Sequence, residues 1–306
     1  MKKLAVIIVT YNSENHIYDC LKSLFEFNDI GDALEVIVVD NCSKDYKPMS
    51  LKIGALYGDK VMVIANDKNG GYGYGNNVGI KASSAPVIMI MNPDVRLISS
   101  VFKVMCDIFE NRPDVVQIGL KQLYPGLRYG YSFSWSTSVH PYISMPLLAL
   151  TKRLDLFIPQ YMYFSGSCFC MSKTAFEKIG LFDENIFLYH EEDDVHQRLR
   201  KQHKNKIIYL RSGKYVHLHL PSKEIIDKNY TTYNRGLRSL ILIFLKRGLS
   251  ELDAVNWELK KFNMLILKEK LLCILGVGNI DYLNYLENWK KNLREKIMVL
   301  RSIINR

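Results

Sequence analysis

Short apolar runs alternate with longer amphipathic stretches through the first 120 residues, and this alternation predicts an α/β fold. The apolar runs have strand length and little polar alternation, which is typical of strands buried on both faces of a mainly parallel sheet. They cover Leu4–Thr10, Glu35–Asp40, Val61–Asn66, Pro86–Asn92 and Val115–Gly119. Between them we expect helices at Glu14–Phe27 after a Ser13 N-cap, Tyr74–Ser83 and Ser99–Asn111. Helices should therefore flank a mainly parallel sheet on both faces.

The pattern changes after this region. Residues 129–172 are rich in aromatic, Ser and Gly residues, which suggests a loop or mixed-strand segment across the sheet edge. A helix is expected from near Ser172 to Gly180, and a second from near His190. Two short strands should follow, at Lys206–Leu210 and Lys214–Leu218. From Lys228 onward the pattern is helical and basic, and no apolar run reaches the roughly eighteen residues of a membrane span.

Charge is distributed unevenly along the 306 residues. Residues 201–306 carry 21 Lys and Arg against 9 Asp and Glu, whereas residues 1–200 carry 20 against 22. A basic region of this kind could meet nucleic acid, an anionic membrane or a phosphate-bearing substrate. The six cysteines show no Cys-x-x-Cys spacing, so we expect buried thiols in a reducing compartment, without disulfides or zinc. Met1–Val9 is too short and lacks a cleavage site, so it predicts a first strand rather than a signal peptide.

Polar residues follow the predicted strands at the edge where such sheets bind ligands. Thr10-Tyr11-Asn12 ends the first strand and Asp40-Asn41-Cys42-Ser43 the second. A carboxylate and an amide there could bind a uracil or thymine imide and the ribose, although helix capping explains part of this pattern and both roles can coexist. Pro93 ends another strand and leaves Asp94 free to face a metal or phosphate; an ordinary Asn-Pro-Asp turn is the alternative.

Glycines are concentrated in residues 69–77, which follow the third strand and enter a helix. Glycines let the backbone approach a ligand closely, and helix N-termini favour phosphate. The segment has neither a dinucleotide-binding Gly-x-Gly-x-x-Gly directly after the first strand nor a Gly-Lys-Ser/Thr ending. A surface loop remains the competing interpretation.

Four consecutive acids follow His190 at the start of a predicted helix, Glu191, Glu192, Asp193 and Asp194. They suit the helix dipole, and Asp194 can pair with Arg198. Crowded carboxylates also have raised pKa values, which suits a group that takes a proton from a hydroxyl. Further along, His217 and His219 share one face of a predicted strand, either as surface imidazoles or with one of them as a metal ligand.

These motifs, in this order, resemble family-2 glycosyltransferases of the GT-A (Rossmann-like) fold, particularly the bacterial rhamnosyltransferase-like branch. The resemblance covers residues 4–222 and is carried by Val9–Asn12, Val38–Ser43, Asn69–Gly73 with Asn76-Asn77, Met91–Asp94 and Gly166–Glu192. It implies a catalytic domain at 1–222, with a nucleotide-binding part at 1–120 and an acceptor-binding part at 121–222. Residues 223–306 would then form a basic helical extension.

The resemblance also implies roles for individual residues. Asp94 corresponds to the last acid of an Asp-x-Asp motif that holds Mg²⁺ or Mn²⁺, with His217 as a further ligand; the first acid is Asn92 here. Glu191-Glu192 corresponds to a Glu-Asp pair whose second member is the catalytic base, which makes Glu192 the expected base and Asp193 its rival. The implied nucleotide-sugar-binding residues are Thr10, Tyr11, Asn12, Asp40, Asn41, Ser43, Asn69, Gly70, Gly71, Tyr72, Asn77 and Asn92.

The expected function is inverting, metal-dependent transfer of rhamnose or a hexose from a dTDP- or UDP-sugar to a glycan or lipid-linked glycan of a surface polysaccharide. The enzyme would lie in the cytoplasm, peripherally at the inner face of the membrane, held by its basic helices on anionic lipid, without nucleic acid. Two other classes remain open. A sugar nucleotidyltransferase would usually carry a basic loop on the first strand, which this chain lacks, and a noncatalytic membrane-associated sugar-binding protein leaves the acidic cluster unexplained.

Overall fold

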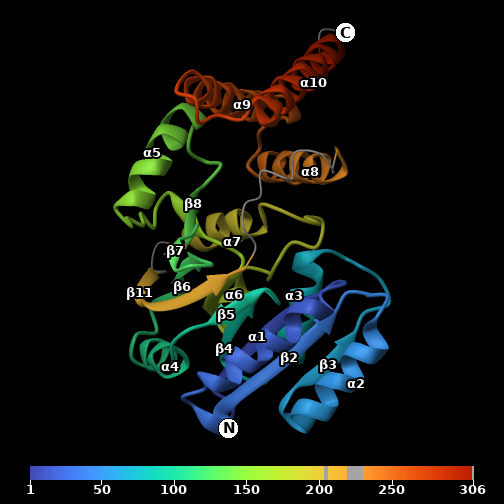
Figure 1. The fold of residues 1–306 in the computed structure, drawn as a ribbon, viewed down its shortest axis with the longest axis vertical. Coiled ribbons are helices and arrows are strands. Elements are labelled where there is room, and N and C mark those ends of the chain that lie inside the picture. The colour runs from blue at the N-terminus through green and yellow to red at the C-terminus, as the bar shows by residue number, and fades with distance from the viewer. Residues whose placement is uncertain (203–205, 219–229, 305–306) are drawn as a thin grey trace. The chain divides into compact units, whose positions relative to one another are not determined.

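The computed structural model describes residues 1–202, 206–218 and 230–304 (Figure 1). They form two compact units, one of Met1–Ser134 with Phe157–Leu220 and the other of Trp135–Leu156 with Pro221–Arg306. The boundary predicted at residue 222 lies outside the described residues. Residues 135–156 join the C-terminal helices in one unit, an association that the sequence does not indicate.

The first unit is built on one large mixed sheet with strand order β3-β2-β1-β4-β10-β6-β11-β5, and β7 pairs with β6. Neighbours among β3, β2, β1 and β4 are parallel, β10 is antiparallel to β4 and β6, and β11 is parallel to β6 and antiparallel to β5. The strands are β1 (Leu4–Thr10), β2 (Leu34–Asp40), β3 (Met62–Ala65), β4 (Val87–Met91), β5 (Val95–Leu97), β6 (Val115–Tyr124), β7 (Arg128–Tyr129), β10 (Cys168–Ser172) and β11 (Lys206–His217). A separate small sheet pairs β8 (Phe133–Trp135) with β9 (Met162–Phe164).

Helices cover both faces of this sheet, which explains the continuous apolar character of β1 and β4. On one face α1 (Glu14–Glu26), α2 (Tyr46–Tyr57) and α4 (Phe102–Asn111) pack in the main core with Leu4, Val6 and Ile8. On the other, α3 (Tyr72–Ala82) approaches so closely that a Cβ at Gly79 would collide with Ile7. The α/β class with a mainly parallel sheet flanked by helices is thus confirmed. Two further helices of this unit are α6 (Lys173–Lys178) and α7 (Glu191–Arg200).

The second unit is helical and has a core of its own. It contains α5 (Pro141–Arg153), α8 (Tyr230–Lys246), α9 (Glu251–Ile274) and α10 (Ile280–Ile304). Leu240, Phe262 and Trp289 are among the buried side chains that join α8, α9 and α10. Ser250 begins α9 with a capping box formed with Asp253. No helix in the described part of the chain is both long and apolar enough to cross a bilayer.

Several local expectations differ from the structure. Ser13 makes no side-chain cap for α1; its Oγ instead accepts from the Tyr11 N–H (3.4 Å) and donates to the Tyr11 carbonyl (3.1 Å). The two strands predicted at residues 206–218 form one strand with an irregularity between Leu210 and Lys214. The segment 129–172 contains β10, which lies in the interior of the sheet rather than at its edge.

Candidate active site

The ends of β1 and β2 are tied together by polar side chains. Asp40 is fully buried and accepts hydrogen bonds from Thr10 Oγ1 (3.0 Å), from the Ser43 backbone N–H (2.8 Å) and from Ser43 Oγ (2.5 Å). The Asn12 N–H donates to Ser43 Oγ (2.8 Å), and Asn12 Oδ1 accepts from the N–H of Lys44 (3.1 Å). The structure therefore joins four of the predicted nucleotide-binding residues in one network. Tyr11 is half exposed and Asn12 is also exposed, so both are open to a ligand.

The glycine-rich loop is fixed against this edge. Asn41 donates through Nδ2 to the carbonyl of Gly71 (2.9 Å) and accepts from Asn66 (2.7 Å). Gly71 has a φ of 92°, and a Cβ there would strike the carbonyl of Phe187. The Tyr72 N–H donates to the same Phe187 carbonyl (3.1 Å). Glycine is thus required at position 71 for both its φ and the close approach of the segment that precedes α7.

The other predicted residues of this loop serve mainly to hold it. Asn69 Oδ1 accepts from the N–H of Gly71 (3.0 Å), and a Cβ at Gly70 would collide with the Tyr74 ring. Asn77 is buried and bonds both the carbonyl (3.0 Å) and the N–H (3.1 Å) of Phe182. The loop and the start of α3 are therefore positioned by contacts far apart in the sequence.

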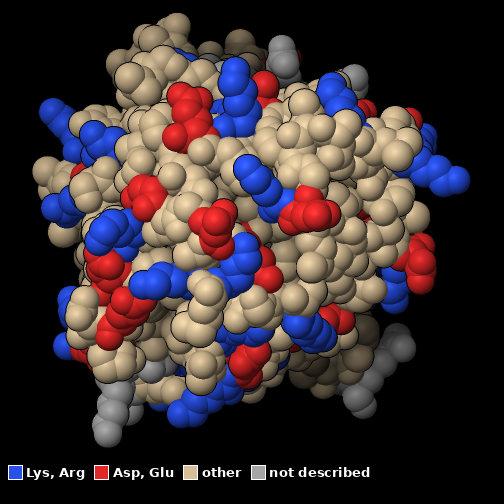
Figure 2. Space-filling view, turned by 90° about the horizontal axis from the view of Figure 1, so that it is seen from below, with Lys and Arg blue, Asp and Glu red and all other residues tan. Residues whose placement is uncertain are grey.

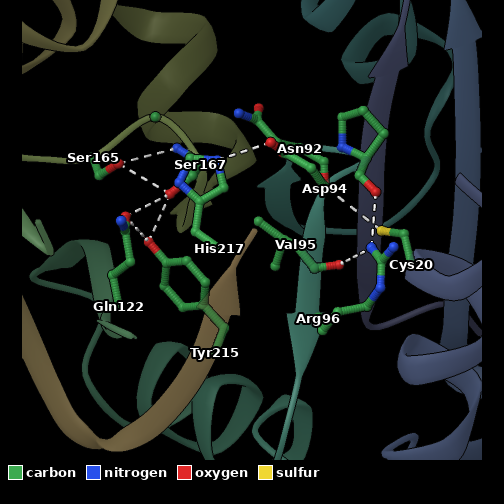
Figure 3. A network of polar contacts seen from close by, with 12 residues as sticks. Cys20, Asn92, Asp94, Val95, Arg96, Gln122, Ser165, Ser167, Tyr215 and His217 are labelled. Atoms are coloured by element: carbon green, nitrogen blue, oxygen red, sulfur yellow. Dashed lines mark hydrogen bonds and ion pairs between the residues drawn. The ribbon is translucent and has the colours of Figure 1, made fainter. Parts of the chain in front are cut away.

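Asp94 and His217 lie side by side at the end of β4 (Figure 3). Asp94 Oδ2 is 3.2 Å from His217 Nε2, and both side chains are partly exposed. The register of the β5–β11 pair places His217 opposite Val95, and the Leu218 N–H donates to the carbonyl of Asp94 (3.0 Å). The structure thus brings together the two residues predicted as metal ligands. His219, the alternative ligand, lies outside the described residues.

The donor set fits a divalent cation that also binds substrate phosphates. One carboxylate and one imidazole can occupy part of a Mg²⁺ or Mn²⁺ shell, and phosphate oxygens and water commonly supply the rest. Among the residues that the structure describes, no group of three or more His, Cys, Asp or Glu side chains is arranged to hold a metal. Asp94 and His217 thus offer one oxygen and one nitrogen ligand to such a cation.

Arg96 fixes the turn that presents Asp94. Its guanidinium donates to the carbonyls of Pro93 (3.0 Å), Val95 (2.8 Å) and His16 (3.0 Å). The bond to His16 connects the turn after β4 to the start of α1. Arg96 therefore holds the backbone of the turn that presents Asp94, and these three bonds do not involve the Asp94 carboxylate.

A buried hydroxyl and amide network supports the same corner from the other side (Figure 3). Ser167 Oγ donates to Gln122 Oε1 (2.9 Å) and lies 2.8 Å from the Tyr215 hydroxyl, which also reaches Gln122 (3.1 Å). The backbone of Ser167 accepts from the N–H of Asn92 (2.8 Å). Tyr215 is fully buried and lies two residues before His217, on the same face of β11. The network thus locks β11 and the end of β4 together.

The acidic segment at the start of α7 is largely buried. Glu191, Asp193 and Asp194 are buried, whereas Glu192 is partly exposed. The charge of Asp194 is compensated by an ion pair with Arg198 (2.6 Å). Preceding the helix, Tyr189 and His190 both have positive φ values, 68° and 70°, which cost conformational energy for residues other than glycine. This strained entry fixes where the first turn of α7 points.

Burial changes the proton affinity of these acids. It raises the pKa of Glu192 to about 7, with a smaller contribution from Asp193. Burial, reinforced by Glu192, holds the pKa of Glu191 well above its usual range. Burial also lowers the pKa of His196 to about 4, so this imidazole is neutral near pH 7. Glu192 is therefore poised to exchange a proton near neutrality.

Gly166 connects Glu192 to the corner that holds Asp94. A Cβ at Gly166 would overlap the Glu192 carboxylate, and the carbonyl of Gly166 accepts from the Tyr72 hydroxyl (2.6 Å). The next residue, Ser167, is the one bonded to Asn92. The two acidic groups are therefore joined through two consecutive residues, Gly166 and Ser167.

Three supporting residues were not found from the sequence, namely Arg96, Gln122 and Tyr215. For Tyr215 a signal existed, because it stands two positions before His217 on a predicted strand. For Arg96 and Gln122 the sequence offers none, since the bonds that tie them to the site include distant partners, His16 for Arg96 and Ser167 for Gln122.

Comparison with known proteins points to one family. A family model described as glycosyl transferase family 2 matches residues 5–180. The low-salt glycan biosynthesis hexosyltransferase Agl10 of Haloferax volcanii is 26% identical over 210 residues, which cover 66% of this chain and 63% of that protein. The poly(ribitol-phosphate) β-N-acetylglucosaminyltransferase TarS of Staphylococcus aureus is 31% identical over 125 residues, or 40% of this chain and 21% of TarS. The matches thus span less than two thirds of these relatives.

Solved structures share the fold at low sequence identity. The mannosyltransferase PcManGT from Pyrobaculum calidifontis, in complex with GDP-Man and Mn²⁺, has a TM-score of 0.56 at 14% identity, with 99% of this chain and 85% of that chain covered. S. aureus TarS 1–349 in complex with UDP-GlcNAc has a TM-score of 0.55 at 18% identity, with 86% and 71% covered. These similarities confirm the GT-A fold.

Proposed function

Because the chain belongs to glycosyl transferase family 2, we propose that it transfers a sugar from a nucleotide-sugar donor to a glycan acceptor, with inversion at the anomeric carbon. Agl10 is named as a glycan biosynthesis hexosyltransferase and TarS as a poly(ribitol-phosphate) β-N-acetylglucosaminyltransferase, and one solved neighbour is a complex with UDP-GlcNAc. A dTDP- or UDP-sugar is the proposed donor, with rhamnose or a hexose as the sugar. The single observation that carries the proposal is the connection of Asp94 to Glu192 through Gly166 and Ser167.

The donor diphosphate is proposed to bind at Asp94 and His217. Their adjacent donor atoms, 3.2 Å apart, support joint coordination of Mg²⁺ or Mn²⁺. Two structural neighbours are described as Mn²⁺ complexes. A cation held there would supply positive charge to the diphosphate leaving group. Arg96 and the Ser167 network keep the two side chains in place during transfer.

The nucleoside is proposed to bind at the ends of β1 and β2. Tyr11 is exposed there, whereas Thr10, Asp40 and Asn41 are buried. The exposed ring suits stacking on a base, and the buried groups suit holding the Tyr11 backbone and the glycine loop in position. Asn92 directly follows β4, two residues before Asp94, and its backbone N–H donates to the carbonyl of Ser167 (2.8 Å).

Glu192 is proposed as the general base. Its partial exposure allows it to reach an acceptor hydroxyl, whereas Asp193 is fully buried. In the transfer step the acceptor oxygen bonds to the anomeric carbon, the carbon–oxygen bond to the diphosphate breaks, and the hydroxyl proton passes to Glu192. A base with a pKa of about 7 is well matched to this work near neutral pH.

The acceptor is proposed to be a lipid-linked glycan at the inner face of the cell membrane. One further relative, 27% identical over 120 residues, is named as a glucosyl-dolichyl phosphate glucuronosyltransferase. The basic excess of residues 201–306 supports an anionic membrane partner. Acidic and basic side chains are interspersed on the face of the molecule seen in Figure 2.

Nucleotide release tests the proposal. The protein is incubated with UDP- and dTDP-sugars, Mn²⁺ and a panel of glycan acceptors, and the released nucleoside diphosphate is measured. Donor-specific, Mn²⁺-dependent release by the wild type is expected, with loss in Glu192→Gln. Release of pyrophosphate from a nucleoside triphosphate and a sugar phosphate would instead identify a nucleotidyltransferase. Sugar binding without any turnover would identify a noncatalytic protein.

A further inference from the structure

Helix α5 buries polar side chains and exposes apolar ones, which is the reverse of the usual pattern for a helix of a globular protein. Its small polar residues Ser144 and Thr151 are buried, and their hydroxyls return to the carbonyls of His140 (3.4 Å) and Leu147 (2.9 Å). The aliphatic side chains lie on the outside, between 37% and 59% exposed, and form a ridge of Ile143, Leu147, Leu150 and Leu154. This spacing aligns them in one stripe. A stripe of this kind is stabilised only by an apolar partner.

A second exposed apolar surface lies at the end of α9 and in its turn to α10. Residues 271–280 contain no charged side chain. Five aliphatic residues between 54% and 80% exposed form this tip, namely Leu271, Ile274, Leu275, Val277 and Ile280. The turn has few side chains that could hydrogen-bond a protein partner. Its chemistry suits a hydrocarbon environment better than a polar protein surface.

The ridge and the tip belong to neighbouring helices of the same unit. At one end His140 Nε2 lies 3.1 Å from Lys260 Nζ, and at the other Lys152 lies close enough to Lys268 for mutual repulsion. Helix α5 therefore runs alongside α9 in the same direction, toward the apolar tip. Burial and Lys268 lower the pKa of Lys152 to about 7. Acidic groups brought near Lys152 would raise this pKa again and favour the charged form.

Positive charge borders both apolar surfaces. Lys152 and Arg153 end α5, and Lys268 precedes the tip together with Lys270, which is paired with Glu287 (2.9 Å). The whole unit carries 18 Lys and Arg against 10 Asp and Glu. Aliphatic side chains bordered by Lys and Arg are the pattern of interfacial helices, in which the cations reach the acidic headgroups.

We propose that the α5 ridge and the α9–α10 tip form the surface by which this protein inserts into the headgroup layer of an acidic bilayer. The alternative occupant, a second copy, is disfavoured by symmetry. An isologous contact sets the same positively bordered patch against itself, so the basic excess of one copy would meet that of the other. The inference assigns the contact to α5 and the tip rather than to residues 281–306, where the basic tail alone would suggest it. It does not depend on the transfer reaction.

Vesicle binding of the full chain tests this assignment. The tip variant Ile274→Ser/Leu275→Ser/Val277→Ser is compared with a matched α10 variant, Met298→Ser/Val299→Ser/Ile303→Ser, whose side chains are similarly exposed. Partition onto phosphatidylcholine vesicles with and without phosphatidylglycerol is measured by sedimentation. The tip variant should lose roughly tenfold or more in partition to acidic vesicles, because three inserted aliphatic groups are removed. The α10 variant should stay within about twofold of the wild type, because surface substitutions away from the contact have small effects.

Three results would overturn the proposal. If the wild-type protein does not bind acidic vesicles, the proposed membrane-binding surface is excluded. If only the α10 variant loses vesicle binding, the contact lies on α10. A concentration-dependent dimer that the tip variant abolishes would make the surface an interface between copies. Unfolding curves verify that both variants are folded. Nucleotide release with a soluble acceptor should be retained in both, so failure of this inference is separable from failure of the proposed transferase activity.

Discussion

The two acidic centres of the first unit are built in different ways. Asp94 and His217 are partly exposed and are placed by the register of two antiparallel strands, whereas the acids of α7 are mostly buried at the start of one helix. Both centres thus keep one carboxylate partly exposed, Asp94 in the first and Glu192 in the second, but only Glu192 shares a helical turn with buried acids. Desolvation there raises the pKa of Glu192 to about 7. We therefore propose separate tasks for the two centres, charge compensation at Asp94 and proton transfer at Glu192.

The largest expected effect comes from removing the base. Glu192→Gln preserves the size of the side chain but cannot accept a proton, so turnover should fall by roughly a thousandfold. The change is measured as kcat for nucleotide release with acceptor present. Asp193→Asn is the matched neighbour and should leave most of the activity. Full transfer by Glu192→Gln together with loss in Asp193→Asn would reverse the base assignment.

Removing the carboxylate at the other centre should act through the cation. Asp94→Asn is expected to lower activity by about a hundredfold at fixed Mn²⁺, with partial recovery at higher Mn²⁺. The measurement is the Mn²⁺ dependence of nucleotide release. Asp107→Asn, at a half-exposed position of α4, removes the same charge away from this corner and serves as control. An unchanged Mn²⁺ requirement in Asp94→Asn would separate this residue from the metal.

The pH profile tests the contrast in burial. Glu192 must be ionised to act as a base. Below its pKa, kcat/KM should therefore increase about tenfold per pH unit, and the profile should bend near pH 7 and then level off. In the folded protein its pKa lies above the ordinary value of 4.5, so ionisation of Glu192 lowers stability as pH increases between these two values. Glu192→Gln should lose this component of the stability profile, measured by urea unfolding. A bend in the kcat/KM profile near the ordinary glutamate pKa of 4.5 would contradict the role of burial.

The smallest effect is expected from the supporting network. Tyr215→Phe removes the hydroxyl that contacts both Ser167 and Gln122. The free energy of unfolding should fall by about 1–3 kcal/mol, because these buried groups each lose a hydrogen-bond partner. Urea unfolding gives this value, and kcat should change only a few-fold. Tyr209→Phe, whose hydroxyl makes a longer bond to Ser132 (3.3 Å), is the control on the same strand. Equal losses in the two variants would show that the network has no special role.

Local patterns predicted the elements that lie early in the chain. β1 and β4 were found because their apolar runs are continuous, and helices α1, α3 and α4 because they fill the intervals between strands. Helix α5 was missed, since its aliphatic face is exposed and Pro146 interrupts it. Strand β10 was missed because its antiparallel position between β4 and β6 depends on partners from distant segments.

The sequence by itself determined the α/β class, the placing of polar residues after β1, β2 and β4, and the acidic start of α7, because these depend on local periodicity and on parallel strands ending at one edge. Only the tertiary structure decided that Asp94 meets His217, through the register of β5 and β11. It also decided that Glu192 stays accessible while Asp193 is buried. Both outcomes depend on contacts between segments more than a hundred residues apart or on packing around a helix, and single-sequence patterns carry no information about either.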